Sequence, residues 1–460
     1  MRLSRLAVFR VPPRVLPLPT LLALVSMALF APAPAVAGQG AEGEAIAFVN
    51  VNVVTMEDEA VIANAVVLVR DGRIEAVGNR DAVAIPHGAQ RIDGGGGYLL
   101  PGLIDGHVHM RNVNALRFYL AHGFTTVRDM NANLSKTLAA RELVEAGELL
   151  GARVVASSPT MLAGPFRDYP APVTAVDGQA LVHKFQEQGY DLIKVFRVRR
   201  DAFLGLMEEA QAQGMPVAGH VPSIGLDDPE TFDGISFDEV MRSGMTSLEH
   251  ILEVALAGTG GVEHADRLPH VAAQVAASGI AIGTLAGAAL TKNRLKEDRE
   301  GFLREEGAHI RAMVGERGLE AVEAIDTSPW DVVPETTIHS VIRTFHRAGV
   351  RLVVGTDSHS PSSLAGETGL AEIELLWASG LTPFAALRAA TRDAADVLGV
   401  GTDVGTVEVG KRADLLLVGG NPLVDPTALR DAVGVMTSGR WLDRADLDLL
   451  MQAAILEGAW

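Results

Sequence analysis

Short apolar runs recur through the middle of the chain, and most are followed by a stretch with helical periodicity such as SKTLAARELVEAG (135–147). Eight of the runs have the length and composition of buried strands: GLIDGHVH (102–109), FTTVRDM (124–130), ARVVAS (152–157), YDLIKVF (190–196), MPVAGH (215–220), MTSLEH (245–250), IAIGT (280–284) and VRLVVGTD (350–357). Alternating strands and helices predict a parallel sheet, and eight such units can close a barrel. An open doubly wound sheet is the alternative, but no Gly-x-Gly-x-x-Gly follows the first strand. We therefore predict an α/β fold, a (β/α)8 TIM-type barrel over residues 101–401.

The two ends of the chain share a different pattern of short strands and glycine turns. Residues 45–55 and 65–78 read as strands, with Asp71-Gly72 as a hairpin signal. Residues 405–420 and 434–443 repeat this style. We therefore predict a small composite β-sandwich domain built from residues 38–100 and 402–460.

One connection in the predicted barrel is far longer than the others. About seventy residues separate IAIGT from VRLVVGTD, and they include the charged helical stretch KNRLKEDREGFLREEGAHIRAMV (292–314). We expect a helical insertion at about 285–345. A cap over the site and a solvated helix pair on the surface are both compatible with this pattern.

The first 37 residues have the pattern of a signal peptide. Four arginines precede an apolar run that ends in Ala35-Val36-Ala37, a small-x-small cleavage pattern. An N-terminal membrane anchor is the alternative, but the run is short for a membrane span. We expect cleavage after residue 37, no stable membrane span afterwards, and export to the periplasm or the extracellular space. Removing the four arginines would change the formal charge from −18 to −22.

Composition limits the possible chemistry. The chain of 460 residues contains no cysteine, so thiolate ligands, disulfides and a cysteine nucleophile are excluded. The net charge is negative and no basic patch suggests a nucleic-acid partner. A metal ion would therefore be held by histidine, carboxylate or a modified lysine.

Six polar residues fall at the predicted carboxyl ends of strands, where barrels of this kind place their active sites. They are His107, His109, Lys194, His220, His250 and Asp357. In an extended chain, residues two apart lie on one face, so the His-x-His pair presents two nitrogens to one point. A lone histidine is more often a core or surface group, but six such residues at strand ends favour a shared site.

These motifs resemble those of the amidohydrolase superfamily. GLIDGHVHM, YDLIKVF, VAGHVP, TSLEH and VVGTDS look like its metal-binding motifs, and GTVEVGKRADLLLVGGNPL resembles its C-terminal return to the small domain. Within the superfamily, the chain is similar to the imidazolonepropionase-like group, which also includes metal-dependent dipeptidases.

The resemblance implies a binuclear centre. His107, His109 and Asp357 would hold the more buried metal, and His220 and His250 the more exposed one. Lys194 would be carboxylated and would bridge both ions. Histidine and oxygen ligands suit Zn²⁺, although Mn²⁺, Co²⁺ and Fe²⁺ remain open.

The implied reaction is hydrolysis of a C–N (amide) bond in a small molecule such as a dipeptide or N-acyl amino acid. A hydroxide bridging the metals would attack the carbonyl, with Asp357 acting as base and then as acid. A mononuclear imidazolone-type cyclic amide hydrolase or deaminase is one rival, and a non-catalytic binding protein on a retained barrel is another.

Substrate contacts are less well defined by the sequence. Tyr169, Arg197 and His359 are candidates, and Arg128 is a further arginine that could bind a substrate carboxylate. The scissile bond and the oligomeric state, a homo-oligomer included, are left open.

Overall fold

The structure is a computed structural model that describes residues 45–162, 169–170, 172–222, 234–328, 331–358 and 363–457. Residues from Glu44 onward form one compact unit. The predicted signal peptide lies outside the described residues. Across the described ranges, no helix combines the length and the apolar character that a membrane span requires.

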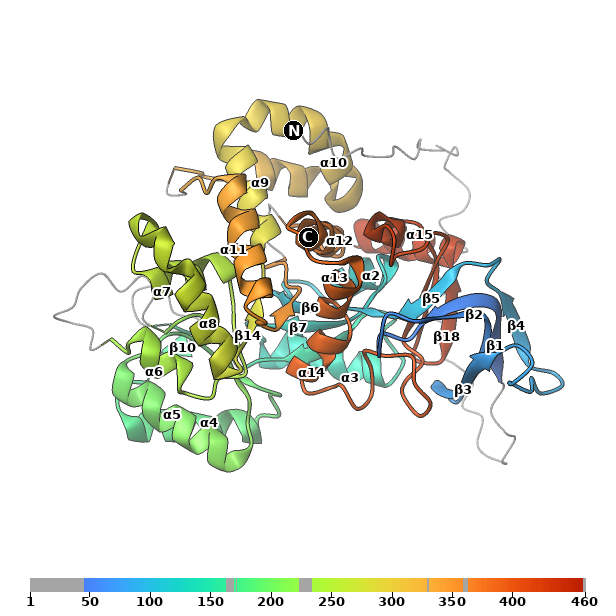
Figure 1. The fold of residues 1–460 in the computed structure, drawn as a ribbon, viewed down its shortest axis with the longest axis horizontal. Helices are drawn as coiled ribbons and strands as arrows, with labels where there is room; N and C mark the ends of the chain where they lie inside the picture. Colours follow the sequence, from blue (N-terminus) through green and yellow to red (C-terminus); the bar gives the residue numbers. More distant parts are fainter. Residues whose placement is uncertain are drawn as a thin grey trace. The chain divides into compact units, whose positions relative to one another are not determined.

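Strands from both ends of the chain form one mixed sheet (Figure 1). Its strands are β1 Ile46–Val54, β2 Val61–Arg70, β3 Arg73–Asn79, β4 Gln90–Asp93, β5 Tyr98–Pro101, β16 Leu415–Val418, β17 Ala432–Thr437 and β18 Arg440–Asp443. The order is β18-β17-β16-β5-β1-β2-β3, with β4 paired to β1. The two chain ends are joined where β5 and β16 pair antiparallel, with Leu99 opposite Leu417. The structure describes one sheet in this region, and a two-layered sandwich stays a prediction.

The apolar side chains of this sheet explain why the two ends associate. Phe48 and Leu99 from the first end pack in one buried cluster with Leu415 and Met436 from the second. Burying such side chains contributes about 1.5–3 kcal/mol each. Neither end can bury these side chains without the other.

The middle of the chain is α/β with parallel strands, as predicted, and each of the eight predicted runs contains a strand. One parallel sheet contains β6 Leu103–Val108, β7 Phe124–Asp129 and β8 Arg153–Ala156. A second contains β9 Met161–Leu162, β10 Tyr169–Pro170, β11 Ile193–Arg197, β12 Val217–Gly219, β13 Ser247–Leu248, β14 Ala281–Gly283 and β15 Leu352–Val353, in the order β10-β9-β11-β12-β13-β14-β15. The assigned strands therefore form two sheets and not a single closed one.

Isolated bridges link both edge strands of the three-stranded sheet to the region of the second sheet. Val108 pairs in parallel with Ser358, and Ser157 pairs with Leu192. Backbone hydrogen bonds extend both contacts, because Gly106 N donates to the Val354 carbonyl at 2.8 Å and Asp191 N donates to the Ala156 carbonyl at 2.9 Å.

Helices follow most of these strands (Figure 1). They are α2 Ala115–Ala121, α3 Ala139–Glu145, α4 Ala175–Glu187, α5 Arg200–Gln213, α6 Phe237–Met241, α7 Ile251–Thr259, α8 Leu268–Ser278, α9 Ala286–Glu297, α10 Arg299–Glu323, α11 Glu335–Arg347, α12 Glu367–Ala378, α13 Pro383–Ala389, α14 Arg392–Val397 and α15 Arg444–Leu456, with short η1 Leu134–Leu138, η2 Val262–Arg267 and η3 Pro426–Arg430. In α11 the buried residues are Ile338, Val341, Ile342 and Phe345, a spacing that places them on one helical face. The segment predicted as an insertion contains α9, α10 and most of α11, while the domain boundaries stay predictions.

Candidate metal centre

Side chains from five strands or their following loops meet near the carboxyl ends of the parallel sheets. His107 is in β6 and His109 follows it, while His220 directly follows β12. His250 comes two residues after β13, and Asp357 comes four residues after β15. Lys194 differs from the prediction, because it is the second residue of β11 and not the residue that ends it.

The first candidate ligand group contains His107, His109 and Asp357. One ligand atom from each lies within 4.8 Å of the others. Asp357 Oδ1 is 3.0 Å from His109 Nε2 and 3.7 Å from His107 Nε2. His107 Nε2 is buried and has no hydrogen-bond partner among the residues that the structure describes. A buried nitrogen without a partner, aimed at a carboxylate and a second imidazole, fits a metal ligand.

The second candidate ligand group contains His220, His250 and Glu253. Their ligand atoms also lie within 4.8 Å of one another. His220 Nδ1 is hydrogen-bonded to Glu253 Oε2 at 2.8 Å, and the His220 and His250 rings stack with centroids 4.5 Å apart. Phe196 lies against the His220 ring, with centroids 4.0 Å apart. Glu253 was not predicted from the sequence.

Lys194 is buried beside both groups. Burial is the main cause of the lowered pKa of His107 and of His220, and the charge of Lys194 lowers both further. Lys194 also interacts electrostatically with Asp357. Only 1 % of the residue is exposed, and Nζ has no hydrogen-bond partner within the described part of the chain. Burial lowers the pKa of Lys194 to about 8, so a neutral amine is accessible near neutral pH. A buried lysine without a partner is costly unless it is modified or paired.

Burial also controls the protonation of the histidines. It lowers the pKa of His250 to about 4, and it holds the pKa of His107 and His220 well below the usual range. These imidazoles are therefore neutral at pH 7, the state in which histidine binds metals. Burial alone would raise the pKa of Asp357, but the hydrogen bond from His109 and the nearby imidazoles hold it well below its usual value. The site thus combines neutral imidazoles with an ionised carboxylate.

Behind His107, a buried ion pair sets the orientation of the ring. Glu249 Oε2 is 2.9 Å from His107 Nδ1, and Glu249 Oε1 accepts hydrogen bonds from Arg128 at 2.7 Å and Ser247 at 2.6 Å. Arg128 also donates to the Gly106 carbonyl at 2.5 Å. With Nδ1–H donating to Glu249, the His107 lone pair is on Nε2, which faces the other ligands. Arg128, one of the candidates for binding a substrate carboxylate, does not fit that role, because it is 1 % exposed and its partners are internal.

Asp105, in the same strand as His107, ties that strand to the loop carrying Asp357. Its carboxylate accepts from Thr356 Oγ1 at 2.7 Å and from His107 N at 3.2 Å. Burial raises the pKa of Asp105 to about 7. Asp357 itself has φ of 59° and His250 has φ of 64°. Left-handed backbone at two non-glycine ligand candidates is uncommon and is typical of functional sites.

Of the three residues predicted to contact substrate, the structure describes the side chain of Arg197 only. Arg197 ends β11 and is half-buried, with its guanidinium 5.1 Å from the centroid of the Phe196 ring. Its Nε is buried and has no hydrogen bond to the described residues. Tyr169 is in β10, but its side chain is outside the described part of the structure, as is all of His359.

Three residues of the site were not assigned by sequence reasoning: Asp105, Glu249 and Glu253. Glu249 and Glu253 flank His250 in TSLEHILEV, and Asp105 interrupts the apolar run LIDGHV. An acid within a buried strand is rare unless it has a partner. That signal could have identified Asp105 and Glu249, but not the groups they contact.

The chain is similar to known proteins over most of its length. The profile of the amidohydrolase family matches residues 98–442. The chain is 26 % identical over 396 residues to an imidazolonepropionase of Symbiobacterium thermophilum, covering 79 % of this chain and 85 % of that one. It is 27 % identical over 383 residues to an imidazolonepropionase of Aromatoleum aromaticum, covering 78 % and 86 %.

Solved structures are similar over most of the chain. A putative prolidase from Bifidobacterium longum is 25 % identical with a TM-score of 0.64, over 90 % of this chain and all of that one. Bottromycin amidohydrolase is 26 % identical with a TM-score of 0.69, over 89 % and 90 %. The chain is thus an enzyme, a hydrolase acting on carbon–nitrogen bonds. Its profile match spans more than half of its length, and it belongs to the amidohydrolase family, in the imidazolonepropionase-like group.

Proposed function

We propose that this chain is an exported binuclear metalloenzyme that hydrolyses the amide bond of a dipeptide or an N-acyl amino acid. The observation that carries the proposal is Lys194, a fully buried amine without a hydrogen bond to any described residue, beside both candidate ligand groups. A single-metal site has no need of a bridging residue, whereas the charge of Lys194 acts on both His107 and His220.

The donor atoms fit two divalent ions. His107, His109 and Asp357 would hold one ion, and His220 and His250 the other, with Glu253 close to the second. Imidazole and carboxylate donors without thiolate suit Zn²⁺. Bound ions of this kind polarise a carbonyl and lower the pKa of water towards about 7.

Lys194 would join the two groups after reaction with carbon dioxide. The neutral Nζ adds to the carbon atom of carbon dioxide and loses one proton, so the amine becomes a carbamate whose two oxygens come from the carbon dioxide. A pKa of about 8 makes the neutral amine available for this step. The product is an anion that can contact both groups, whereas a lysine cation would repel divalent ions.

The same proposal includes a closed barrel. The order β6-β7-β8-β11-β12-β13-β14-β15 would form a ring of eight strands, supported by the bridges Ser157–Leu192 and Val108–Ser358. Closure would bring β6 beside β15, and this neighbourhood explains how His107 and Asp357 share one group. The ligand side chains would then lie around the carboxyl end of the ring.

Asp357 is the residue best suited to move the proton. Its Oδ1 lies between the two imidazoles of the first group, 3.0 Å from His109 Nε2, and 22 % of its side chain is exposed. It is ionised at neutral pH, so it can accept a proton from the attacking water and return it to the leaving nitrogen.

Arg197 is suited to bind a carboxylate of the substrate. Its Nε is buried without a hydrogen bond to the described residues, and its guanidinium lies over Phe196, which contacts His220. A dipeptide or N-acyl amino acid carries a carboxylate close to its amide bond. Arginine binds such a group with two parallel hydrogen bonds.

The second candidate function is hydrolysis of a cyclic amide by a single-metal enzyme of the imidazolonepropionase kind. It is favoured by the curated relatives at 26–27 % identity over about four fifths of this chain. The third possibility raised by the sequence, a non-catalytic binding protein on a retained barrel, is not favoured by any of these relatives.

A substrate screen tests the proposal. Metal-loaded protein is assayed against dipeptides, N-acyl amino acids and 4-imidazolone-5-propanoate, each with a chelator control. We expect turnover of at least one open-chain amide with a free carboxylate. Turnover of the imidazolone alone would contradict the proposal and support the rival.

A further inference from the structure

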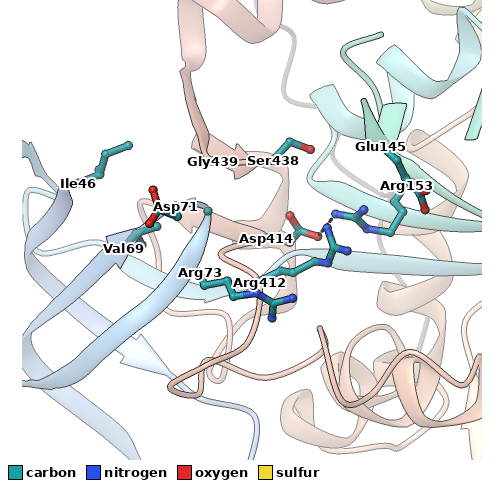
Figure 2. Close-up of a pocket in the computed structure, with 11 residues that line it drawn as sticks. Ile46, Val69, Asp71, Arg73, Glu145, Arg153, Arg412, Asp414, Ser438 and Gly439 are labelled. Carbon is teal, nitrogen blue, oxygen red and sulfur yellow. Dashed lines mark hydrogen bonds and ion pairs between the residues drawn. The ribbon is translucent and has the colours of Figure 1, made fainter. Parts of the chain in front are cut away.

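A cavity of about 440 Å³ lies away from the candidate metal ligands, where both chain ends meet the amino end of β8 (Figure 2). None of the six predicted ligands lines it. One lining residue, Arg153, is the first residue of β8, whereas the metal ligands cluster towards the other end of the parallel strands. The volume is in the range of small-molecule sites.

Two hairpin turns form one wall of this cavity. Asp71 and Gly72 connect β2 to β3, and Ser438 and Gly439 connect β17 to β18; their φ angles are 50°, 72°, 49° and 74°. A Cβ atom at Gly72 would lie 3.3 Å from Gly439 N, so the two turns touch. Ala413 N also donates to the Gly72 carbonyl at 2.8 Å. The wall is therefore fixed by contacts between the two ends of the chain.

Arg153 brings a buried, incompletely satisfied cation to the cavity. Its side chain is 9 % exposed, and Nη2 is 3.2 Å from Asp414 Oδ2. The other Asp414 oxygen accepts from Thr437 at 3.3 Å. Arg153 Nε is buried and has no hydrogen-bond partner among the described residues. A buried donor in this state is satisfied by a water molecule or by a ligand.

Two further arginines, Arg73 and Arg412, add positive charge to the lining. Figure 2 shows the Arg412 and Arg153 guanidinium groups both directed towards Asp414. The Arg412 ion pair in the described structure is to Asp403 at 4.0 Å, beyond hydrogen-bonding distance, and Arg73 shares that carboxylate at 3.1 Å. Three guanidinium groups, those of Arg73, Arg153 and Arg412, thus share two carboxylates, Asp414 and Asp403, and this part of the wall carries an excess positive charge.

Two acidic residues give other parts of the lining the opposite charge. Asp71 and Glu145 are exposed, and the described residues provide no ion-pair partner for either. Ile46 and Val69 add apolar surface. A purely anionic ligand would be repelled by the two exposed acids, and a purely cationic one by the three arginines of the lining.

We propose that this cavity binds a free α-amino acid. Its carboxylate would be bound by Arg153 and Arg412, its ammonium group by Glu145, which lies on the Arg153 side of the cavity in Figure 2, and an aliphatic side chain would contact Ile46 and Val69. The site is separate from the metal centre, and the proposal does not depend on which amide the enzyme hydrolyses.

Calorimetric titration of the full-length protein tests this assignment. L-Leucine is the probe, and the protein is stripped of metal with a chelator so that the metal centre cannot hold a carboxylate. We expect one site per chain, with 4-methylpentanoate, which lacks the ammonium, and 3-methylbutylamine, which lacks the carboxylate, each binding about tenfold more weakly or worse. Equal binding of 4-methylpentanoate and leucine, or no heat with leucine, would overturn the proposal.

Variants locate the binding. Arg412→Gln and Glu145→Gln, both outside the core, are each expected to weaken leucine binding about tenfold or more without changing turnover. Arg70→Gln is the matched control, because Arg70 pairs with Glu75 in the same hairpin at 2.9 Å but does not line the cavity. Unchanged affinity in Arg412→Gln, with an unaltered melting temperature, would place the ligand elsewhere and refute the assignment.

Discussion

The two candidate ligand groups differ in the support that the protein gives them. The first group is backed by a fully buried ion pair, because Glu249 contacts His107 and is itself held by Arg128. In the second group, His220 is held by Glu253, another member of the group, whose side chain is 35 % exposed. The first group is thus preorganised by the core, while the second depends on a carboxylate that water can reach. We expect the first to hold its ion more tightly and to survive metal stripping with its geometry intact.

The largest expected effect is on the reaction itself. Asp357→Asn removes the proton acceptor of the first group and replaces a charged ligand with a neutral one. We expect kcat to fall by about 10²–10⁴-fold on the best substrate of the screen. Asp403→Asn, on the distant surface near Arg73, is the control and should keep its activity. If Asp357→Asn kept full turnover, Asp357 would not be the residue that transfers the proton.

The next largest effect is on stability, and it compares the two carboxylates that contact ligand histidines, Glu249 and Glu253. Glu249→Gln leaves Arg128 as an uncompensated buried cation, which costs about 3–5 kcal/mol of the free energy of unfolding. Glu253→Gln acts at a partly exposed contact and should cost about 1 kcal/mol or less. Urea denaturation of the metal-free proteins measures both. Equal losses of the free energy of unfolding would mean that Glu249 and Glu253 contribute equally to stability and that the core does not favour the first group.

The pH dependence of metal reloading isolates Lys194. Its pKa is lowered to about 8, so the reactive neutral amine is half-populated at pH 8 and falls as the pH decreases. At constant dissolved carbon dioxide, carbamate formation should be roughly fifty-fold slower at pH 6 than at pH 8. His250 has a pKa of about 4 and stays neutral across this range, so its protonation does not cause the change. A rate that is the same at both pH values would argue against a reacting lysine.

The smallest expected effect is on substrate binding. Arg197→Ala should raise KM for a carboxylate-bearing substrate about tenfold while kcat changes little, because the interaction is present before and during the reaction. Arg199→Ala, an exposed arginine two residues away, is the control. A fall in kcat with unchanged KM would assign Arg197 a different role.

The sequence predicted the ligand candidates because each belongs to a short apolar run with a polar residue near its end. His220, His250 and Asp357 follow strands in this way, and such positions can be recognised from the sequence alone. Lys194 was found by the same rule although it is inside β11, because strand bounds cannot be located to the residue from sequence.

The supporting residues could not be predicted in the same way. Glu249 and Arg128 are 121 positions apart, and only the packing of β7 near β13 brings their charges together. From the sequence, Arg128 was a candidate for binding a substrate carboxylate, yet the structure buries it almost completely. Contacts of this kind depend on which strands are neighbours and which way each side chain points, and a single sequence does not contain that information.

The central claim is that Lys194 joins two metal ions, and metal stoichiometry combined with ¹³C NMR in labelled bicarbonate tests it most directly. The account predicts about two ions per chain and one carbamate signal, with both the signal and at least one ion lost in Lys194→Ala. One ion per chain in both proteins, without a carbamate signal, would contradict it.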